Sequence, residues 1–327
     1  MQILVTGAAG FIGFSLCQKL LKKKISVVGI DNFNDYYDKN LKINRYKELK
    51  KINKKFKIFN TDLENFNKIK KIFSRYKFDI VYHFAAQAGV RFSILNPDSY
   101  FNSNLFGFYN VLKCSNLNKV KHLIIASSSS VYGKNSFGAS EKTSTDFPLQ
   151  FYAATKKSNE VMAYSFSNIY KLPITAIRFF TIYGPWGRPD MSLFKFVDAI
   201  INKKTIYLYN KGNHHRDYTY IDDILKPLIN LTKILPKKNN TPFQVFNLGN
   251  GKSIYLKEFY NELISQIGKK TKLKLLKQQK GDAHRTLSIN NKAKKILGFK
   301  SNTNYKLGIK KFLKWYLNYY KINEKNN

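Results

Sequence analysis

Tyr152 and Lys156 are the two side chains of this sequence best placed for acid–base chemistry, because they lie four residues apart. At this spacing two residues share one face of a helix, so the ammonium can approach the phenolic oxygen. A free tyrosine has a pKa of about 10, and a neighbouring cation favours the phenolate and lowers that pKa. The pair could therefore act as a base, although the same spacing also arises by chance on amphipathic helices.

A run of serines, Ser127 to Ser130, begins 25 residues before Tyr152. The apolar segment from Val120 to Ala126 leads into this run and predicts a strand that ends at the serines. A hydroxyl at that strand end could share the proton path with Tyr152. The helix that carries Tyr152 is expected to continue to about Tyr170.

Three glycines, Gly7, Gly10 and Gly13, follow a strand-like segment at residues 2–6 and open a helical pattern. Such a turn lets backbone N–H groups approach a pyrophosphate, and the helix N-terminus adds a favourable dipole. A second strand ends at Asp31, 18 residues after Gly13, where a carboxylate can accept hydrogen bonds from both hydroxyls of an adenosine ribose. We interpret this as an NAD site rather than a structural turn with a surface aspartate. The acid also disfavours the extra phosphate of NADP.

The third strand, expected at residues 56–60, is followed by Asp62 and Leu63. A carboxylate there could meet the adenine amino group, or it could cap the following helix. The next strand, at residues 80–86, is apolar throughout, which is typical of a strand buried on both faces of a parallel sheet. We interpret His83 within it as a satisfied core residue rather than a catalytic group.

Strands and helices alternate along the first half of the chain, which predicts an α/β fold with a Rossmann-type, doubly wound parallel sheet. Ligands of such sheets collect at the carboxyl ends of the strands, and the glycine turn, Asp31, Ala85-Ala86 and the serines all occupy such ends. We predict an NAD-binding domain and a smaller C-terminal α/β substrate domain. The first comprises residues 1–180 with a returning segment at about 217–248, and the second residues 181–216 and 249–327.

The segment from Phe179 to Met191 is rich in turn formers and aromatic residues, which is typical of a binding loop. His214 and His215 stand close to Asp217, a pattern that could indicate a metal site. Consecutive residues of an extended segment point apart, however, and no third ligand has suitable spacing. We therefore expect no bound metal.

The chain carries 57 Lys and Arg residues against 20 Asp and Glu residues, a formal net charge of +37. The basic residues are scattered over almost every predicted helix, so we interpret them as a solvated surface and expect no specific nucleic-acid partner. The sequence contains no run of about 18 apolar residues, so we expect no membrane span. Cys17 and Cys114 lie in apolar helical patterns, as expected of reduced core residues in a cytoplasmic protein.

Six motifs together give the chain a family resemblance. The general ones are residues 6–13, Tyr152 with Lys156, and residues 216–223; the more specific ones are residues 31–38, 152–157 and 178–191. Over essentially its full length the chain resembles an extended short-chain dehydrogenase/reductase, and within that group the UDP-glucuronate 4-epimerases. The resemblance implies an NAD-dependent isomerase for polysaccharide biosynthesis, which interconverts UDP-glucuronate and UDP-galacturonate through a 4-keto sugar.

In such enzymes the tyrosine is the base, so Tyr152 would take the proton of the sugar 4-hydroxyl while the C4 hydride passes to a tightly bound NAD. Lys156 would hold the nicotinamide ribose and lower the pKa of the tyrosine. Ser128 matches the hydroxyl of the proton path, which contacts the substrate, and Ser129 is the other candidate. The further NAD contacts implied are Gly7, Gly10, Phe11, Ile12, Gly13, Asp31, Asn32, Asp62, Leu63, Ala85, Ala86, Asn104 and Ser127.

The same resemblance implies that Arg188 and Thr181 bind the substrate carboxylate, for which a bidentate guanidinium is suited. The alternative for Arg188 is an ion pair that stabilises its loop. Arg216 matches a residue that binds the UDP diphosphate, and Asp282 matches one that contacts the ribose or sugar. The helices that carry Tyr109 and Tyr152 resemble the family's dimer surface, so a homodimer is expected.

No acidic residue is adjacent to the serines in the sequence, whereas decarboxylases and dehydratases of the group carry one next to the corresponding hydroxyl. Gln279 stands where galactose-type 4-epimerases usually carry arginine, which weakens that alternative. The alternatives left open are a UDP-glucose/UDP-galactose or UDP-N-acetylhexosamine 4-epimerase and, less favoured, a nucleotide-sugar dehydratase or decarboxylase, or an NAD-binding protein without catalysis. The residues Ala283 to Arg285 depart from the epimerase pattern and leave the substrate contacts there open.

Overall fold

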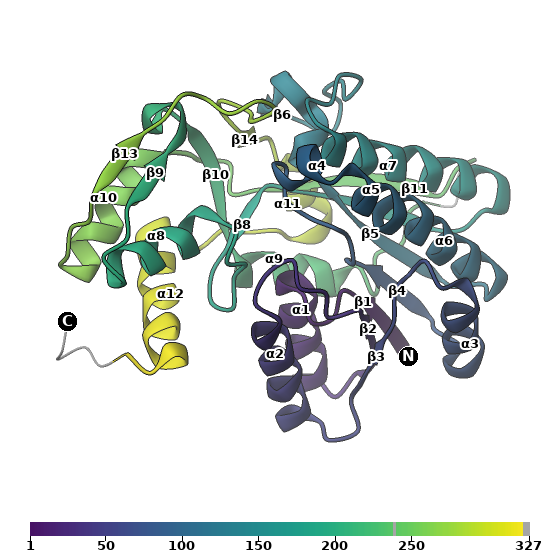
Figure 1. The fold of residues 1–327 in the computed structure, drawn as a ribbon. Coiled ribbons are helices and arrows are strands. Elements are labelled where there is room, and N and C mark those ends of the chain that lie inside the picture. The colour runs from purple at the N-terminus through teal and green to yellow at the C-terminus, as the bar shows by residue number, and fades with distance from the viewer. Residues whose placement is uncertain (238–239, 323–327) are drawn as a thin grey trace.

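The computed structural model describes residues 1–237 and 240–322, and its centre is a seven-stranded parallel sheet (Figure 1). The strand order is β11-β7-β5-β4-β1-β2-β3, so the chain starts in the middle, builds outward to β3 and then crosses to the other side. This reversal between β1 and β4 is the place where ligands of doubly wound sheets bind. The strands are β1 (Gln2–Thr6), β2 (Ser26–Asp31), β3 (Lys57–Asn60), β4 (Ile80–His83), β5 (His122–Ser128), β7 (Ile174–Phe179) and β11 (Phe243–Leu248).

Helices cover both faces of this sheet. Successive residues of a strand point to opposite faces, and both sets are apolar here, so each face must be buried. In β1, Ile3 and Val5 pack in one apolar cluster and Leu4 in the cluster on the other face, and all three are fully buried. This double burial explains why the strands read as nearly continuous apolar runs. The first face carries α1 (Phe11–Lys22), α2 (Lys39–Ile52) and α9 (Ile221–Asn230), and the second carries α3 (Phe66–Tyr76), α6 (Gly107–Leu117) and α7 (Phe151–Tyr170).

The helix and the strand that carry the predicted catalytic groups are both present. The predicted helix of Tyr152 is confirmed as α7, whose N-terminus is capped by the Gln150 side chain. β5 begins and ends two residues later than predicted, so Ser127 and Ser128 are its last residues. The segment between β4 and α6 contains α4 (Phe92–Leu95), α5 (Pro97–Tyr100) and a π-helix (Phe101–Phe106).

Short strands and helices form a second group of elements, on the left of Figure 1. β8 (Thr181–Tyr183), β10 (His215–Tyr220) and β12 (Ser253–Tyr255) make a three-stranded sheet. Two small pairs accompany it: β9 (Ile206–Leu208) with β13 (Leu273–Leu275), and β6 (Phe137–Ala139) with β14 (Leu287–Ser288). The helices here are α8 (Ser192–Ile201), α10 (Leu256–Ile267) and α12 (Tyr305–Tyr320), while α11 (Asn291–Leu297) packs against β11.

Cys17 and Cys114 are both buried and free in the structure, so the prediction that they are core residues is confirmed. His83 is also buried, at 2% exposure, and its Nδ1 lies 2.9 Å from the Thr6 hydroxyl, as expected of a satisfied core histidine. Within residues 1–237 and 240–322, no helix combines the length and the apolar character needed to cross a membrane.

Candidate active site

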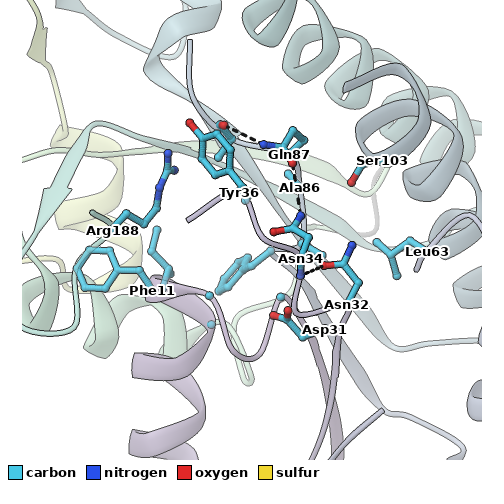
Figure 2. Close-up of a pocket in the computed structure, with 18 of the residues that line it drawn as sticks. Phe11, Asp31, Asn32, Asn34, Tyr36, Leu63, Ala86, Gln87, Ser103 and Arg188 are labelled. Carbon is cyan, nitrogen blue, oxygen red and sulfur yellow. Dashed lines mark hydrogen bonds between the residues drawn. The ribbon is translucent and has the colours of Figure 1, made fainter. Parts of the chain in front are cut away.

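The predicted site residues gather around two neighbouring cavities that share Tyr36 as a lining residue. The first cavity, drawn in Figure 2, lies at the carboxyl ends of the parallel strands and is lined by the glycine turn, Asp31, Ser128 and Tyr152. The second cavity lies among the short strands and is lined by Arg216 and Asp282. The site therefore has one part on the regular sheet and a second part on the irregular elements.

The glycine turn after β1 fits closely against the loop after β4. Gly7 has a φ of +71°, and a Cβ added there would lie 2.7 Å from the backbone nitrogen of Ala85. A Cβ on Gly13 would lie 2.1 Å from the carbonyl oxygen of Gly7. Only glycine fits both positions, so the turn leaves backbone groups bare where a pyrophosphate could approach.

Asp31 is 8% exposed at the end of β2 and lines the first cavity. Its two carboxylate oxygens accept hydrogen bonds from the backbone nitrogens of Ala9 and Phe33, both at 2.9 Å. Burial raises the pKa of Asp31, and these hydrogen bonds with the nearby Lys42 charge offset only part of that rise. Each carboxylate oxygen has more than one lone pair, so Asp31 can still accept from a ribose.

Asp62 is exposed after β3 and accepts a hydrogen bond from the Asn32 side chain at 2.5 Å, so the two predicted adenosine-side residues are in contact. The capping role that the sequence left open for Asp62 belongs to Asn65, whose side chain accepts from the nitrogen of Lys68. Leu63 lies between them and is buried. Asp62 is therefore free to face the cavity.

Tyr152 and Lys156 both line the first cavity, and Arg188 is a further cation that lines it. Burial raises the pKa of Tyr152, and Arg188 together with a hydrogen bond from Ser128 opposes this rise only in part. The Nζ of Lys156 donates to the carbonyl oxygen of Ala126 at 2.9 Å, and burial lowers the pKa of Lys156 to about 8. Arg188 is therefore a second cation, besides the expected Lys156, that can favour the Tyr152 phenolate.

The three candidate serines have different surroundings. Ser128 lines the first cavity and its Oγ accepts from the backbone nitrogen of Ser130 at 3.1 Å, whereas Ser129 lies outside the lining. Ser127 also lines the cavity, but its hydroxyl donates to Glu160 at 2.5 Å. Because a carboxylate can only accept, Ser127 presents lone pairs and no proton to a ligand.

The carboxylate of Glu160 belongs to a buried network behind the serines. It binds the guanidinium of Arg178 through both oxygens, at 2.8 and 2.7 Å, and both side chains are about 5% exposed. Arg178 in turn donates to the hydroxyl of Tyr132 at 3.0 Å, which donates to Asn247 at 2.6 Å. The network connects the end of β5 with β7, α7 and β11, so contacts with three other elements fix the position of the serines.

Two predicted carboxylate-binding residues are placed differently. Arg188 lines the first cavity, and its guanidinium forms an ion pair with Asp190, in which Nε lies 2.9 Å from Oδ1. The charge and hydrogen bonds of Asp190 outweigh burial and raise the pKa of Arg188, so it stays protonated. Thr181 pairs with Tyr218 in the three-stranded sheet and lies outside the cavity lining.

In the second cavity, Arg216 is held by backbone carbonyls: it donates to His215 at 3.0 Å and to His284 at 3.2 Å. Asp282 forms an ion pair with Arg91 at 3.2 Å, and the Arg91 guanidinium lies 4.4 Å from the centre of the Tyr209 ring. The residues that depart from the epimerase pattern thus contribute a carbonyl to Arg216. The side chain of Arg285 points elsewhere, over the ring of Phe137 at 4.1 Å.

Asn104, expected among the NAD contacts, lies behind the lining at 1% exposure. Its side chain accepts from the backbone nitrogen of Gln87 at 2.7 Å and donates to the carbonyl of the same residue at 3.0 Å. It therefore supports the loop after β4. Its neighbour Ser103 lines the cavity instead.

Several lining residues were not assigned by the sequence argument: Asn34, Tyr36, Tyr37, Lys42, Gln87, Ser103 and Met191. Four of these follow β2, in or next to the segment 31–38, which was recognised only as a specific motif. The signal was thus present, but nothing in its spacing assigned a role to each side chain. Among the described residues, no cluster of three or more His, Cys, Asp or Glu side chains is arranged to hold a metal ion.

A glycine turn on the first strand, an acid at the end of the second and a Tyr-x-x-x-Lys helix facing the serines of β5 place the chain in the class of extended short-chain dehydrogenases/reductases. The family follows from a direct comparison. Residues 4–312 match the family model described as GDP-mannose 4,6 dehydratase, and the chain belongs to this family.

Similar proteins narrow the resemblance further. The chain is 44% identical to protein CapI of Staphylococcus aureus, over 98% of this chain and 100% of that protein. It is 42% identical to a UDP-glucuronate 4-epimerase of Thermodesulfobacterium geofontis, over 95% of each. A crystal structure of UDP-glucuronic acid 4-epimerase from Bacillus cereus in complex with UDP-glucuronic acid and NAD matches with a TM-score of 0.91 at 32% identity, over 98% of this chain and 100% of that one. The resemblance to UDP-glucuronate 4-epimerases is thereby confirmed.

Proposed function

We propose that the chain is an NAD-dependent UDP-glucuronate 4-epimerase, which interconverts UDP-glucuronate and UDP-galacturonate. The observation that carries the proposal is the position of Arg188, which faces the same cavity as Tyr152 and favours its phenolate. In a uronate the carboxylate is attached to the carbon next to C4. A planar cation beside the base therefore suits a sugar with an anion next to the reacting centre.

The first cavity fits NAD, because the bare glycine turn suits a pyrophosphate and Asp31 offers acceptors to a ribose. Bound there, NAD would supply the hydride chemistry at C4 of the sugar, as acceptor in the oxidation and as donor in the reduction that follows. Tyr152 takes and returns the proton of the 4-hydroxyl, and Ser128 donates a hydrogen bond to the same oxygen. Lys156 uses one N–H on Ala126, so two remain for ribose hydroxyls.

The second cavity is the proposed place of the UDP group. Arg216 presents a guanidinium that backbone carbonyls hold in position, which suits a diphosphate. The Bacillus cereus relative was solved with both UDP-glucuronic acid and NAD, and its match over 98% of this chain supports the binding of both kinds of ligand here. With NAD in the first cavity and UDP in the second, the sugar lies where the two cavities adjoin, between Tyr152 and Arg188.

The proposed domains follow the two cavities: residues 1–180 with the returning segment 217–248 for NAD, and residues 181–216 and 249–327 for the UDP-sugar. Of these ranges, residues 238–239 and 323–327 lie outside the described part of the chain. Within the returning segment, α9 packs on one face of the main sheet and β11 is a strand of that sheet. By contrast, β10 pairs with β8 and β12 in the three-stranded sheet. We further propose that the enzyme works in the cytoplasm.

We also propose a homodimer through the outer face of the π-helix, α6 and α7. This face exposes large apolar side chains, including Phe101 at 55%, Tyr109 at 39%, Val161 at 56% and Tyr164 at 51%. Exposed apolar patches of this kind are typical of protein interfaces. Light scattering is expected to give twice the chain mass of 38.1 kDa, and the monomer mass excludes the dimer.

Incubation of the purified protein with UDP-glucuronate, followed by separation of the products, tests the function. We expect UDP-galacturonate to form until an equilibrium is reached, and Tyr152→Phe serves as the control for contaminating activity. Unchanged substrate contradicts the proposal. A UDP-pentose indicates decarboxylation, and faster interconversion of UDP-glucose and UDP-galactose moves the assignment to a hexose epimerase.

A further inference from the structure

Two of the specific motifs, residues 31–38 and 178–191, contribute side chains to one cluster, in which the proposed chemistry uses Arg188 and assigns no role to Tyr36 or Asp190. The hydroxyl of Tyr36 donates to Oδ2 of Asp190 at 3.2 Å. Arg188 grips the same carboxylate side-on, with Nε 2.9 Å from Oδ1 and Nη2 2.5 Å from Oδ2. Asp190 thus receives hydrogen bonds from both motifs.

This cluster forms the wall between the two cavities. Arg188 lines the first cavity, Asp190 lines the second, and Tyr36 lines both; Figure 2 shows Tyr36 and Arg188 on the same side of the first cavity. The tyrosine is closely fitted, because a Cβ on Gly89, whose φ is +104°, would lie 2.2 Å from its hydroxyl oxygen. Its ring also packs against Phe92, with centroids 5.0 Å apart. The wall is therefore a built feature rather than a loose surface contact.

The geometry leaves part of the guanidinium available. Arginine has five N–H donors, and Asp190 takes the Nε–H and one N–H of Nη2. The remaining three donors lie at the Nη1 and Nη2 end, where a second carboxylate can bind with two parallel hydrogen bonds. Burial opposes ionisation of Asp190, but the Arg188 charge outweighs it and holds the pKa of Asp190 below its usual value, so the grip persists at neutral pH.

We propose that Asp190, oriented by Tyr36, is a positioning residue: it holds Arg188 side-on, so that the free end of the guanidinium receives the carboxylate of the sugar. This inference rests on the proposed function, because it assumes a uronate substrate. It also explains why the two motifs occur together. Tyr36 of the first motif and Asp190 of the second are 154 residues apart in the sequence and come into contact only in the folded chain.

The same pair has a second effect, on the base. The titratable groups that face Tyr152 are Arg188 and Asp190 from the loop after β8, Tyr100 from α5 and Lys156 from its own helix. Arg188 lowers the pKa of Tyr152, whereas Asp190 raises it. Removal of the negative charge of Asp190 should therefore lower the pKa of the base and move the acidic limb of the pH profile, where the base becomes protonated, to lower pH.

The test is Asp190→Asn, which keeps the side-chain size but removes the charge that holds Arg188. We expect the KM for UDP-glucuronate to rise roughly tenfold, about 1.4 kcal/mol. The affinity for UDP, which lacks the sugar carboxylate, should stay within about twofold, and the pH profile of kcat/KM should shift downwards. Tyr36→Phe removes one hydrogen bond to Asp190 and should give a smaller change of KM in the same direction, which keeps the test open if the first variant does not fold.

Asp79→Asn is the matched control, because Asp79 also pairs with a cation, Lys121, at 2.7 Å. Asp79 precedes β4 and so lies at the amino-terminal end of the strands, away from both cavities. Equal losses for UDP and UDP-glucuronate, or an unchanged KM in both cluster variants, overturn the inference. Tighter uronate binding by Asp190→Asn overturns it as well, because Asp190 would then be a competitor of the substrate. If the wild-type chain does not turn over UDP-glucuronate, the proposed function fails first, which separates the two claims.

Discussion

The two cavities are built by different means, although they serve one reaction. The first is made largely of backbone at the ends of parallel strands, as in the glycine turn that fits against Ala85. The second is lined by side chains from short strands, loops and α8, and its ion pair between Arg91 and Asp282 joins residues 191 positions apart. The difference teaches that a regular sheet fixes a binding site by geometry, whereas an irregular region needs specific side-chain pairs. Substitutions can separate these two modes.

The largest effect is expected at the junction of the cavities, from Tyr152→Phe. This change removes the proton acceptor and keeps the ring, so turnover should fall by roughly 100-fold or more. NAD and UDP-sugar should both remain bound, because each cavity keeps its own contacts. Steady-state rates and the NAD content of the purified protein provide the measurement. Tyr170→Phe, at the exposed end of the same helix, is the control, and near-normal turnover of Tyr152→Phe contradicts its role.

Gly7→Ala tests the backbone mode of the first cavity. The added methyl would lie 2.7 Å from the Ala85 nitrogen at a φ of +71°, so the turn must shift. We expect a loss of roughly 50-fold in NAD affinity, about 2.3 kcal/mol, while the affinity for UDP changes little. Titration of the protein, after removal of bound NAD, with NAD and with UDP measures both affinities.

A second glycine separates strain from the clash. Gly268 has a φ of +74°, but nothing lies within 4 Å of a Cβ added to it. Gly268→Ala should therefore cost about 1 kcal/mol of stability and leave NAD binding intact. If both variants lose NAD equally, or neither does, the close fit of the turn against β4 is not what forms the cofactor site.

Arg188→Ala tests the side-chain mode where the cavities adjoin. Loss of hydrogen bonds from a charged donor should weaken UDP-glucuronate by about 2 kcal/mol, roughly 30-fold, and UDP by much less. Arg216→Ala is the matched comparison, because a diphosphate contact should weaken both ligands alike. Calorimetry with the two ligands distinguishes the variants. Equal losses of both ligands in Arg188→Ala would make this arginine a structural residue of its loop.

The sequence predicted the first cavity in more detail than the second, and the physical reason is periodicity. The helix of Tyr152 and the strand ends at Asp31 and Ser128 follow from apolar patterns that repeat every two or 3.6 residues. Once the strands are parallel, their ends must meet at one edge. The fold class and the meeting of Asp31, Ser128 and the glycine turn at one end of the sheet therefore follow without any knowledge of long-range contacts.

Other contacts could not be predicted, because they depend on pairs that no local pattern encodes. Tyr36 meets Asp190 across 154 residues, and the Arg178 guanidinium reaches Glu160 behind the serines. Asn104 shows the limit from the other side: the sequence selected the right segment, but the turn of the π-helix puts Ser103 in the lining. A shift of one residue on a helix changes which side chain faces a ligand, and spacing alone cannot resolve it.

The smallest effect is expected from His284→Ala, and it concerns the residues that depart from the epimerase pattern. Arg216 is held by the carbonyl of His284, at 3.2 Å, and every amino acid supplies that carbonyl. The imidazole of His284 is exposed, with its centroid 6.2 Å from that of His214, so its loss should change the affinity for UDP by less than about twofold. A loss above about fivefold would show that the side chain itself contacts the nucleotide. The expected result means that the second cavity tolerates a change of side chain at His284, because the backbone carbonyl of this residue, rather than its imidazole, makes the contact.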